Sequence, residues 1–129
     1  MNAFKESLAT GAYTEDTTLE DACKGADVLI GVSGPGAFTD TCLKNLAENP
    51  VIFAMSNPEP EVRPEHAKEV RPDCIMATGR SDYPNQINNV LCFPYLFRGV
   101  LDCRAVNVNQ KMKIAAAEAL ASLAQQEVG

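Results

Sequence analysis

Three short apolar runs, each about the length of a β-strand, divide the chain. They are ADVLIGV at 26–32, VIFAM at 51–55 and DCIMATG at 73–79. The first run is continuous, rich in β-branched residues and preceded by Gly25, a pattern typical of a parallel strand that is buried on both faces. We therefore predict three strands, of which the first has no solvent-exposed face.

Apolar residues at helical spacing occupy the segments before and between these runs. Thr17 or Thr18 is a suitable cap for the second of these segments, and a Thr-Asp pair begins the third. Pro64 opens the fourth, where the first turn of a helix tolerates proline. Connections this short between strands imply right-handed crossovers, so the pattern predicts a parallel α/β sheet. The predicted helices cover residues 2–9, 17–24, 39–48 and 64–71.

The last third of the chain is predicted to be helical throughout. Residues 88–105 form an apolar segment that predicts a long helix, bent at Pro94 because proline removes a hydrogen bond inside a helix. Residues 109–126 are rich in alanine and predict a terminal helix. One face of that helix is expected to carry Met112, Ala116, Ala119 and Leu123.

Composition and charge limit the possible functions. The chain has 129 residues, 46% of them hydrophobic and 22% charged, which is ordinary for a globular protein, and we predict one domain over 1–129. The formal net charge of -6 argues against binding to nucleic acid or to an anionic membrane, since both require positive charge. The apolar runs are too short to span a membrane, and the N-terminus lacks the apolar core of a signal peptide. We therefore expect a cytoplasmic protein without nucleic-acid or membrane partners.

The cysteines and the single histidine do not suggest a metal site. The five cysteines are odd in number, widely spaced and set among apolar residues, which favours reduced, buried thiols in a cytosol. No Cys-x-x-Cys pair occurs, and the one histidine, His66, lies on a charged helical segment that favours a surface position. The sequence therefore predicts no metal ligands and no nucleophile paired with a base.

Candidate binding residues follow the three predicted strands. They are Ser33, Gly34 and Gly36 after the first strand, Asn57 after the second, and the long segment TGRSDYPNQINN at 78–89 after the third. Ligands of an open parallel sheet bind beyond the carboxyl ends of its strands. We therefore expect these three loops to line one site.

Each candidate also has a purely structural interpretation. The glycines of SGPG allow a backbone to approach a ligand and offer amides to a ribose or phosphate, but a tight turn explains them equally well. Asn57 can bind a carboxylate or a hydroxyl, or can satisfy the backbone of its own loop. Asn88 and Asn89 can cap a helix, and one can cap while the other binds a ligand. Arg80 and Asp82 are expected to form a solvated or structural pair.

Four segments, taken together and in order, resemble the closing part of a bacterial-type malic enzyme. These are GADVLIGVSGPGAFT, NPVIFAMSNPEPE, ATGRSDYPNQINNVLCFPYLFRGVLDCRA and MKIAAAEALA, and the resemblance runs over roughly 22–121. It implies oxidative decarboxylation of malate to pyruvate with NAD or NADP and a divalent metal, Mg or Mn. It also implies a fold: a partial Rossmann-like, three-layer αβα unit with a parallel sheet, the C-terminal part of an NAD(P)-binding domain, followed by long helices.

The resemblance assigns roles to the candidates in the loops. It implies that Ser33, Gly34 and Gly36 lie along the nicotinamide ribose, with Asn57 beside the cofactor as well. It further implies that Asn57 and Asn89 hold the substrate and that Asn88 supports Asn89. Neutral donors of this kind help to orient a dicarboxylic 2-hydroxy acid for hydride transfer.

Several parts of that family's active site have no counterpart in the sequence. Its catalytic tyrosine and lysine, its acidic metal ligands and its glycine-rich phosphate loop belong to upstream segments, and no G-x-G-x-x-G occurs here. We therefore expect no catalytic residue in this chain, no activity from it alone, and a Met1 that is an internal methionine or an artificial boundary. The choice between NAD and NADP stays open.

One further expectation follows from a Rossmann-like sheet that lacks the strands upstream of the first predicted strand. The first predicted strand should be left with an exposed edge, which self-association or the missing N-terminal part of the enzyme would hide. The alternative to an enzyme segment is a non-catalytic nucleotide-binding or assembly module derived from the same domain. Restored malate-dependent reduction upon complementation would distinguish the two.

Overall fold

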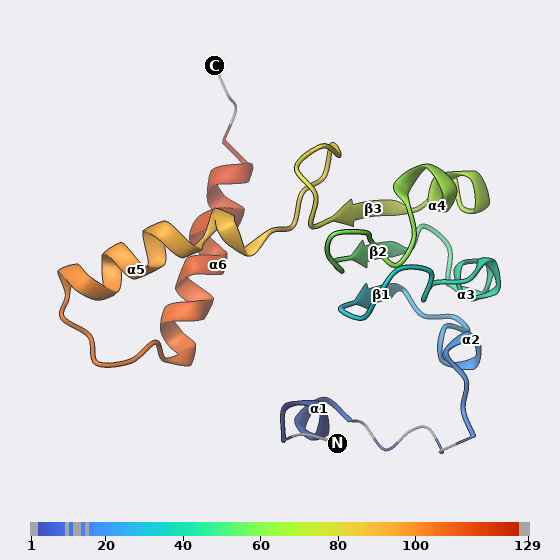
Figure 1. Cartoon of the computed structure of the whole chain (residues 1–129), viewed down its shortest axis with the longest axis horizontal. Coiled ribbons are helices and arrows are strands. Elements are labelled where there is room, and N and C mark those ends of the chain that lie inside the picture. The colour runs from blue at the N-terminus through green and yellow to red at the C-terminus, as the bar shows by residue number, and fades with distance from the viewer. Residues whose placement is uncertain (1–2, 10, 12–13, 15, 127–129) are drawn as a thin grey trace. The chain divides into compact units, whose positions relative to one another are not determined.

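The computed structural model describes residues 3–9, 11, 14 and 16–126, and the chain divides into two units. The first unit comprises Met1–Ile87 and the second Asn88–Gly129. Figure 1 shows the helices and strands of both units.

A parallel three-stranded sheet forms the centre of the first unit. Its strands β1 (Val28–Gly31), β2 (Val51–Ala54) and β3 (Ile75–Thr78) lie in the order β1-β2-β3. Val28 pairs with Val51, and Val51 pairs with Ile75, so the three strands begin and end level with one another. The α/β class with a parallel sheet is thus confirmed, and β1 lies at one edge of the sheet, as expected.

Four short helices accompany the sheet, and each corresponds to a predicted helix. They are α1 (Ala3–Leu8), α2 (Leu19–Ala22), α3 (Asp40–Asn45) and α4 (Pro64–Val70). Thr18 caps α2 by accepting a hydrogen bond from the amide of Asp21, and Thr39 caps α3 in the same way. Pro64 occupies the first turn of α4. Residue 2, where the first predicted helix was expected to begin, lies outside the described residues.

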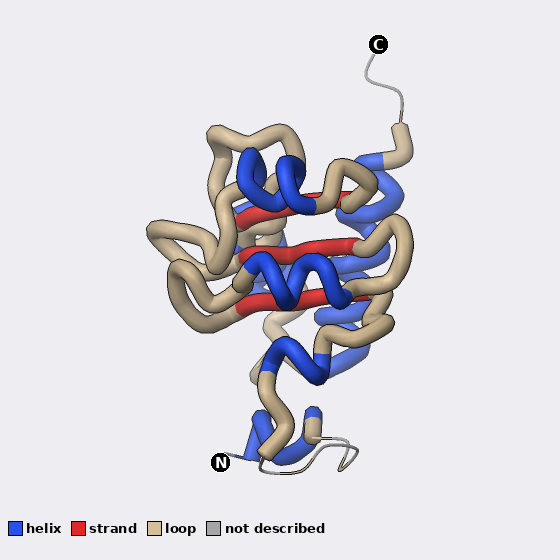
Figure 2. The backbone as a smooth tube through the Cα atoms, turned by 90° about the vertical axis from the view of Figure 1, so that its right-hand side faces the viewer, coloured by secondary structure: helices blue, strands red, loops and turns tan. Residues whose placement is uncertain are grey.

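The core lies between the sheet and helices α3 and α4. These two helices pack against each other, α4 also packs against β3, and both lie on the same side of the strands (Figure 2). The core consists of Cys23, Leu29, Phe38, Cys42, Leu43, Leu46, Ile52, Ala54, Val62, Ala67, Cys74 and Met76. Burial of these side chains is the main source of stability for this unit.

The two faces of the sheet differ in burial. Leu29 and Ile52, on the face toward α3 and α4, are 8% and 0% exposed. Val28 and Ile30, whose side chains alternate to the other face, are 49% and 57% exposed. The prediction that this strand is buried on both faces is therefore wrong for the described chain, because these helices cover one side of β1 only.

Over residues 88–126, the described part of the second unit, the chain forms three helical elements. A 3-10 turn (η1, Asn89–Leu91) precedes α5 (Phe93–Asp102), and α6 (Gln110–Ala124) follows, capped by Asn109. The predicted helix over 88–105 is thus divided in two. The predicted bend at Pro94 is wrong, since the proline lies in the first turn of α5, where no hydrogen bond to its nitrogen is needed.

The cysteines match the prediction only in part. All five are free, and Cys23, Cys42 and Cys74 are buried. Burial raises the pKa of Cys23 to about 12. Cys92 is only partly buried and Cys103 is exposed, so the prediction of burial is wrong for Cys103, which follows the last turn of α5 at the surface.

In the part of the chain that the structure describes, no helix is both long and apolar enough to cross a membrane.

Candidate functional site

The carboxyl ends of the three strands meet at one edge of the sheet. The arrowheads of β1, β2 and β3 point the same way in Figure 1, and a loop follows each. We call residues 32–39 the first loop, 55–63 the second loop and 79–87 the third loop. Parallel register brings these loops together at the edge where α/β sheets bind their ligands.

The first loop leaves the sheet through Ser33, Gly34 and Gly36. Gly36 has a φ of 77°, and the amide of Ala37 donates to the carbonyl of Gly34 at 3.3 Å, so the loop contains a tight turn. A Cβ atom added at Gly34 or at Gly36 would have no atom within 4 Å. The turn therefore accounts for the glycine at 36, whereas neither crowding nor a positive φ accounts for the glycine at 34.

Two amides of the first loop are already engaged within the protein. The Ser33 amide donates to the Glu61 side chain at 2.8 Å, and the Gly36 amide donates to the Glu61 carbonyl at 2.9 Å. The expectation that this loop turns its amides toward a ribose or phosphate is therefore wrong for these two. The Ser33 residue is exposed, although its hydroxyl donates to Glu61 at 3.4 Å, and Gly34 is half-buried with no atom near the position of a Cβ.

The second loop carries Asn57, which is exposed. The Asn57-Pro58 peptide bond is cis. A Cβ atom added at Gly79 would lie 3.4 Å from the Asn57 side-chain nitrogen, which places the amide group against the start of the third loop. The residue before it, Ser56, is buried, and its hydroxyl donates to the Glu59 carbonyl at 2.5 Å. Asn57 thus projects from a backbone that is fixed just before it.

The third loop folds back onto the end of β3. The Thr78 amide donates to the carbonyl of Asn85 at 3.1 Å, and the Ile87 amide donates to the carbonyl of Thr78 at 2.7 Å. The Asn85 side chain donates to the Met76 carbonyl at 3.0 Å. These bonds close the segment 79–86 into a loop whose two ends lie together.

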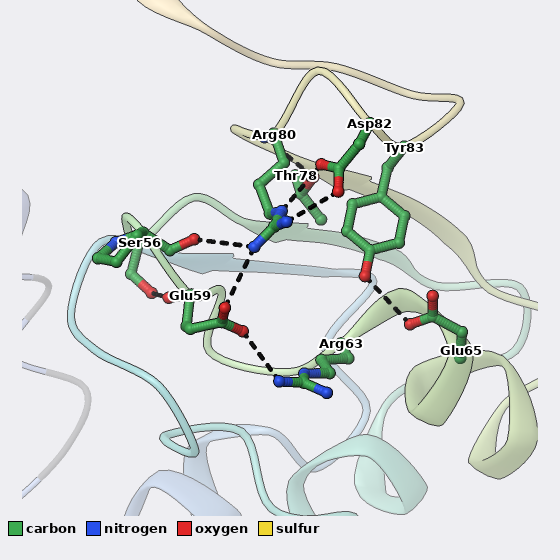
Figure 3. A network of polar contacts seen from close by, with 9 residues as sticks. Ser56, Glu59, Arg63, Glu65, Thr78, Arg80, Asp82 and Tyr83 are labelled. Atoms are coloured by element: carbon green, nitrogen blue, oxygen red, sulfur yellow. Dashed lines mark hydrogen bonds and ion pairs between the residues drawn. The ribbon is translucent and has the colours of Figure 1, made fainter.

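Arg80 joins the third loop to the second (Figure 3). Its guanidinium donates to both carboxylate oxygens of Asp82 at 2.8 Å, to Glu59 at 3.2 Å and to the Pro58 carbonyl at 3.4 Å. Hydrogen bonds and charge attraction from Asp82 raise the pKa of Arg80, so its positive charge is compensated within the protein. The expected pair between Arg80 and Asp82 is confirmed, and it also connects two loops.

Glu61, in the second loop, is a buried carboxylate whose position the sequence did not reveal. It is 0% exposed, although its neighbours in sequence include Pro58 and Pro60, typical of a surface loop. One oxygen accepts from the Ser33 amide at 2.8 Å and the other from the Ser56 amide at 3.1 Å. The sequence shows only that apolar residues, Pro60 and Val62, flank Glu61, and this does not reveal its burial.

The remaining candidates, Asn88 and Asn89, lie in the second unit. The Asn88 side chain accepts from the Val90 amide at 3.0 Å and caps η1, in agreement with its structural interpretation. Asn89 is the first residue of that turn and is exposed. The structure thus brings Ser33, Gly34, Gly36 and Asn57 to one edge of the first unit, and it places the two asparagines at the start of the other unit.

His66 is a surface residue, as predicted. It lies on α4, with its side chain 49% exposed, and Nε2 lies 2.7 Å from an oxygen of Asp40. The hydrogen bond to Asp40 raises the pKa of His66. Among the described residues, no group of three or more His, Cys, Asp or Glu side chains is arranged to hold a metal ion.

Comparison with known proteins identifies the family. The family model of the malic enzyme NAD-binding domain matches residues 2–129, and thus extends over both units. The NADP-dependent malic enzyme of Halomonas elongata is 54% identical over 128 residues, which make up 99% of this chain and 30% of that enzyme. The NAD-dependent malic enzyme of Rhizobium meliloti is 50% identical over 114 residues, or 88% of this chain and 15% of that enzyme.

Solved structures agree with the sequence comparison. The malic enzyme of Pyrococcus horikoshii superposes with a TM-score of 0.75 and 46% sequence identity, over 84% of this chain and 25% of that one. The chain therefore spans less than a third of the length of these relatives. By its sequence and its fold, the chain belongs to the family of malic enzyme NAD-binding domains.

Proposed function

We propose that this chain supplies part of the cofactor and substrate site of a malic enzyme, which oxidatively decarboxylates malate to pyruvate and CO2 with reduction of NAD or NADP. The catalytic tyrosine and lysine would come from other segments of such an enzyme. The observation that carries the proposal is the convergence of the first and second loops, with Ser33, Gly34, Gly36 and Asn57, at one edge of a parallel sheet.

The first loop is suited to the cofactor. The fold does not require glycine at position 34, since a Cβ atom would meet no other atom there and φ is not positive. Close approach of a ligand to the backbone would explain the glycine. Ser33 is exposed, and its hydroxyl, which donates to Glu61 at 3.4 Å, can still accept from a ribose hydroxyl. We assign Ser33, Gly34 and Gly36 to the nicotinamide ribose, with the Gly36 contribution limited to the shape of the turn.

Asn57 is suited to lie between cofactor and substrate. Its exposed amide can donate to a malate carboxylate and accept from a hydroxyl at the same time. The amide lies against Gly79, where a larger residue would press on it. In the complete enzyme, Asn89 would contact the substrate as well, while Asn88, which caps η1, would support Asn89.

The cofactor would perform the hydride chemistry, and the residues of this chain would orient it. Relatives include both NADP-dependent and NAD-dependent malic enzymes, so the proposal leaves the two cofactors open. A divalent metal, Mg or Mn, is part of the proposed enzyme. Its ligands would come from other segments of that enzyme.

The proposal also includes a partner surface, a cellular location and the extent of the domain. The exposed apolar side chains of Val28, Ile30 and Ile75 support a partner surface on the sheet, either a second copy or the remainder of the enzyme. Five free cysteines support a cytoplasmic location. We regard residues 1–129 as one partial NAD(P)-binding domain, since the family model extends through both units.

A graft tests the function directly. The chain would replace the matched segment of the Halomonas elongata enzyme, whose other segments would supply the rest of the active site. We expect the graft to reduce NADP when malate is present and not when it is omitted. A graft that folds and binds NADP but does not turn over malate would contradict the proposal and favour the non-catalytic binding module.

A further inference from the structure

The Glu61 side chain connects two loops that are far apart in the sequence. Its carboxylate accepts the Ser33 amide, 28 positions away and just after β1, and the Ser56 amide, just after β2. The Ser33 hydroxyl also lies 3.4 Å from the same oxygen as the Ser33 amide. The second of these amides belongs to the residue that precedes Asn57. One carboxylate therefore fixes the backbone beside both proposed ligand contacts.

The backbone of Glu61 strengthens the same connection. Its carbonyl accepts from the Gly36 amide at 2.9 Å and lies 3.5 Å from the Phe38 amide. The side chain thus holds the beginning of the first loop, and the carbonyl holds its end. Movement of Glu61 would displace the whole turn that contains Gly34.

A glycine in β1 makes room for this carboxylate. A Cβ atom added at Gly31 would lie 2.5 Å from Cδ of Glu61, 2.6 Å from its Oε1 and 2.7 Å from the Phe38 ring. Such distances are too short for any real contact, and Gly31 itself has no positive φ that would demand glycine. The glycine at 31 is therefore explained by the space that Glu61 occupies.

The chemistry of Glu61 fits a role in alignment better than a role in packing alone. A buried charge is costly, and an apolar residue of similar volume would fill the space without that cost. A carboxylate offers something else, namely two acceptor atoms at a fixed separation. Burial raises the pKa of Glu61, but the amides of Ser33 and Ser56 lower it by more, so the group stays ionised at neutral pH as an acceptor for both amides.

We propose that Glu61 is a positioning residue, which sets the first loop against the second so that the cofactor contacts and Asn57 are aligned for hydride transfer. The inference rests on the proposed function, because it names the residue that orients that same site. Glu61 touches neither cofactor nor substrate in this account. It acts through the backbone of Ser33 and of Ser56.

The test is Glu61→Gln in the grafted enzyme, with Glu69→Gln as control. Glutamine keeps the volume of Glu61 but turns one acceptor into a donor, so one of the two amides loses its partner. Glu69 lies on α4 with its side chain 76% exposed, and its substitution removes the same charge. We expect Glu61→Gln to lower kcat about 10- to 100-fold and to change the KM values for NADP and malate far less. The control should retain wild-type kinetics.

The isotope effect separates positioning from a merely structural loss. With malate deuterated at C2, misalignment should slow hydride transfer selectively and raise the isotope effect on kcat. A smaller folded fraction would lower the apparent kcat and leave the isotope effect unchanged. An unchanged isotope effect, or a kcat equal to that of the wild type, would overturn the proposal.

Amide hydrogen exchange, measured in the chain by itself, tests the role of Glu61 without requiring enzyme activity. At least one of the Ser33 and Ser56 amides should exchange at least about tenfold faster in Glu61→Gln than in the wild type, even if the wild-type graft proves inactive. Wild-type protection of both amides would refute the connection between the loops. If Glu61→Gln does not fold, Glu61→Asp provides a second test, because aspartate keeps the charge but its shorter side chain withdraws both oxygens. Glu61→Asp should also lower kcat and speed amide exchange. A folded Glu61→Asp variant with wild-type kcat and wild-type exchange would overturn the proposal.

Discussion

Glu61 and Arg80 each connect two of the three loops, but their surroundings differ. Glu61 is 0% exposed and accepts hydrogen bonds from two backbone amides. Arg80 has a side chain that is 33% exposed, and its partners Asp82 and Glu59 are 57% and 42% exposed. The first connection therefore lies inside the protein, whereas the second lies partly in water.

The difference in burial decides how much each connection contributes. Loss of a buried acceptor leaves an amide without a partner, at a cost of about 1–3 kcal/mol. Water replaces an exposed partner, and an exposed ion pair contributes about 0–1 kcal/mol. The larger number of bonds at Arg80 does not make it the stronger connection. We infer that the second loop is joined more firmly to the first loop than to the third, which is anchored chiefly to the end of β3.

Gly31→Ala should have the largest effect on stability, because it disrupts the buried contacts of Glu61 that connect the first and second loops. The new methyl group would collide with Glu61 and Phe38, neither of which can move into solvent. We expect the free energy of unfolding, measured by urea denaturation, to fall by about 1–3 kcal/mol. Gly34→Ala is the matched control, since its Cβ would meet open space, and should change stability by no more than about 0.5 kcal/mol. Equal unfolding free energies of Gly31→Ala and Gly34→Ala would contradict the claim that the space beside Glu61 is closely packed and important for stability.

Arg80→Ala should have a smaller effect, confined to the exposed connection. We expect a loss in unfolding free energy that is smaller than that of Gly31→Ala, and smaller still in high salt, where charge interactions are screened. The same urea titration at two salt concentrations measures it. A loss as large as that of Gly31→Ala, and independent of salt, would show that the third loop is held as firmly as the other two.

The sequence predicted the three strands and the starts of most helices, because these depend on local patterns. Apolar runs located β1, β2 and β3, and Thr18, Thr39 and Pro64 located the starts of their helices. The same local reasoning failed for Pro94. A proline in a long apolar segment can either bend one helix or begin another, and the preceding 3-10 turn, which settles the matter, has no clear signature.

The candidate site was predictable only in part. The end of each strand could be read from the sequence, so the meeting of the first two loops was foreseen. The burial of Glu61 could not be foreseen, because it depends on Gly31 and Ser33, about 30 positions away. For the same reason the sequence suggested ligand-facing amides where the fold directs two of them to Glu61.

The most direct test of the central claim, that one edge of this sheet holds malate beside its cofactor, is the effect of Asn57→Ala on kcat/KM for malate in the grafted enzyme. Asn107→Ala, which removes an exposed amide between α5 and α6, is the control. If the Asn57 amide contacts a charged group of the substrate, its loss should cost roughly 1.5–3 kcal/mol of transition-state stabilisation. That corresponds to a fall in kcat/KM of about 10- to 150-fold. An Asn57→Ala graft with the same kcat/KM as the Asn107→Ala control would contradict the account.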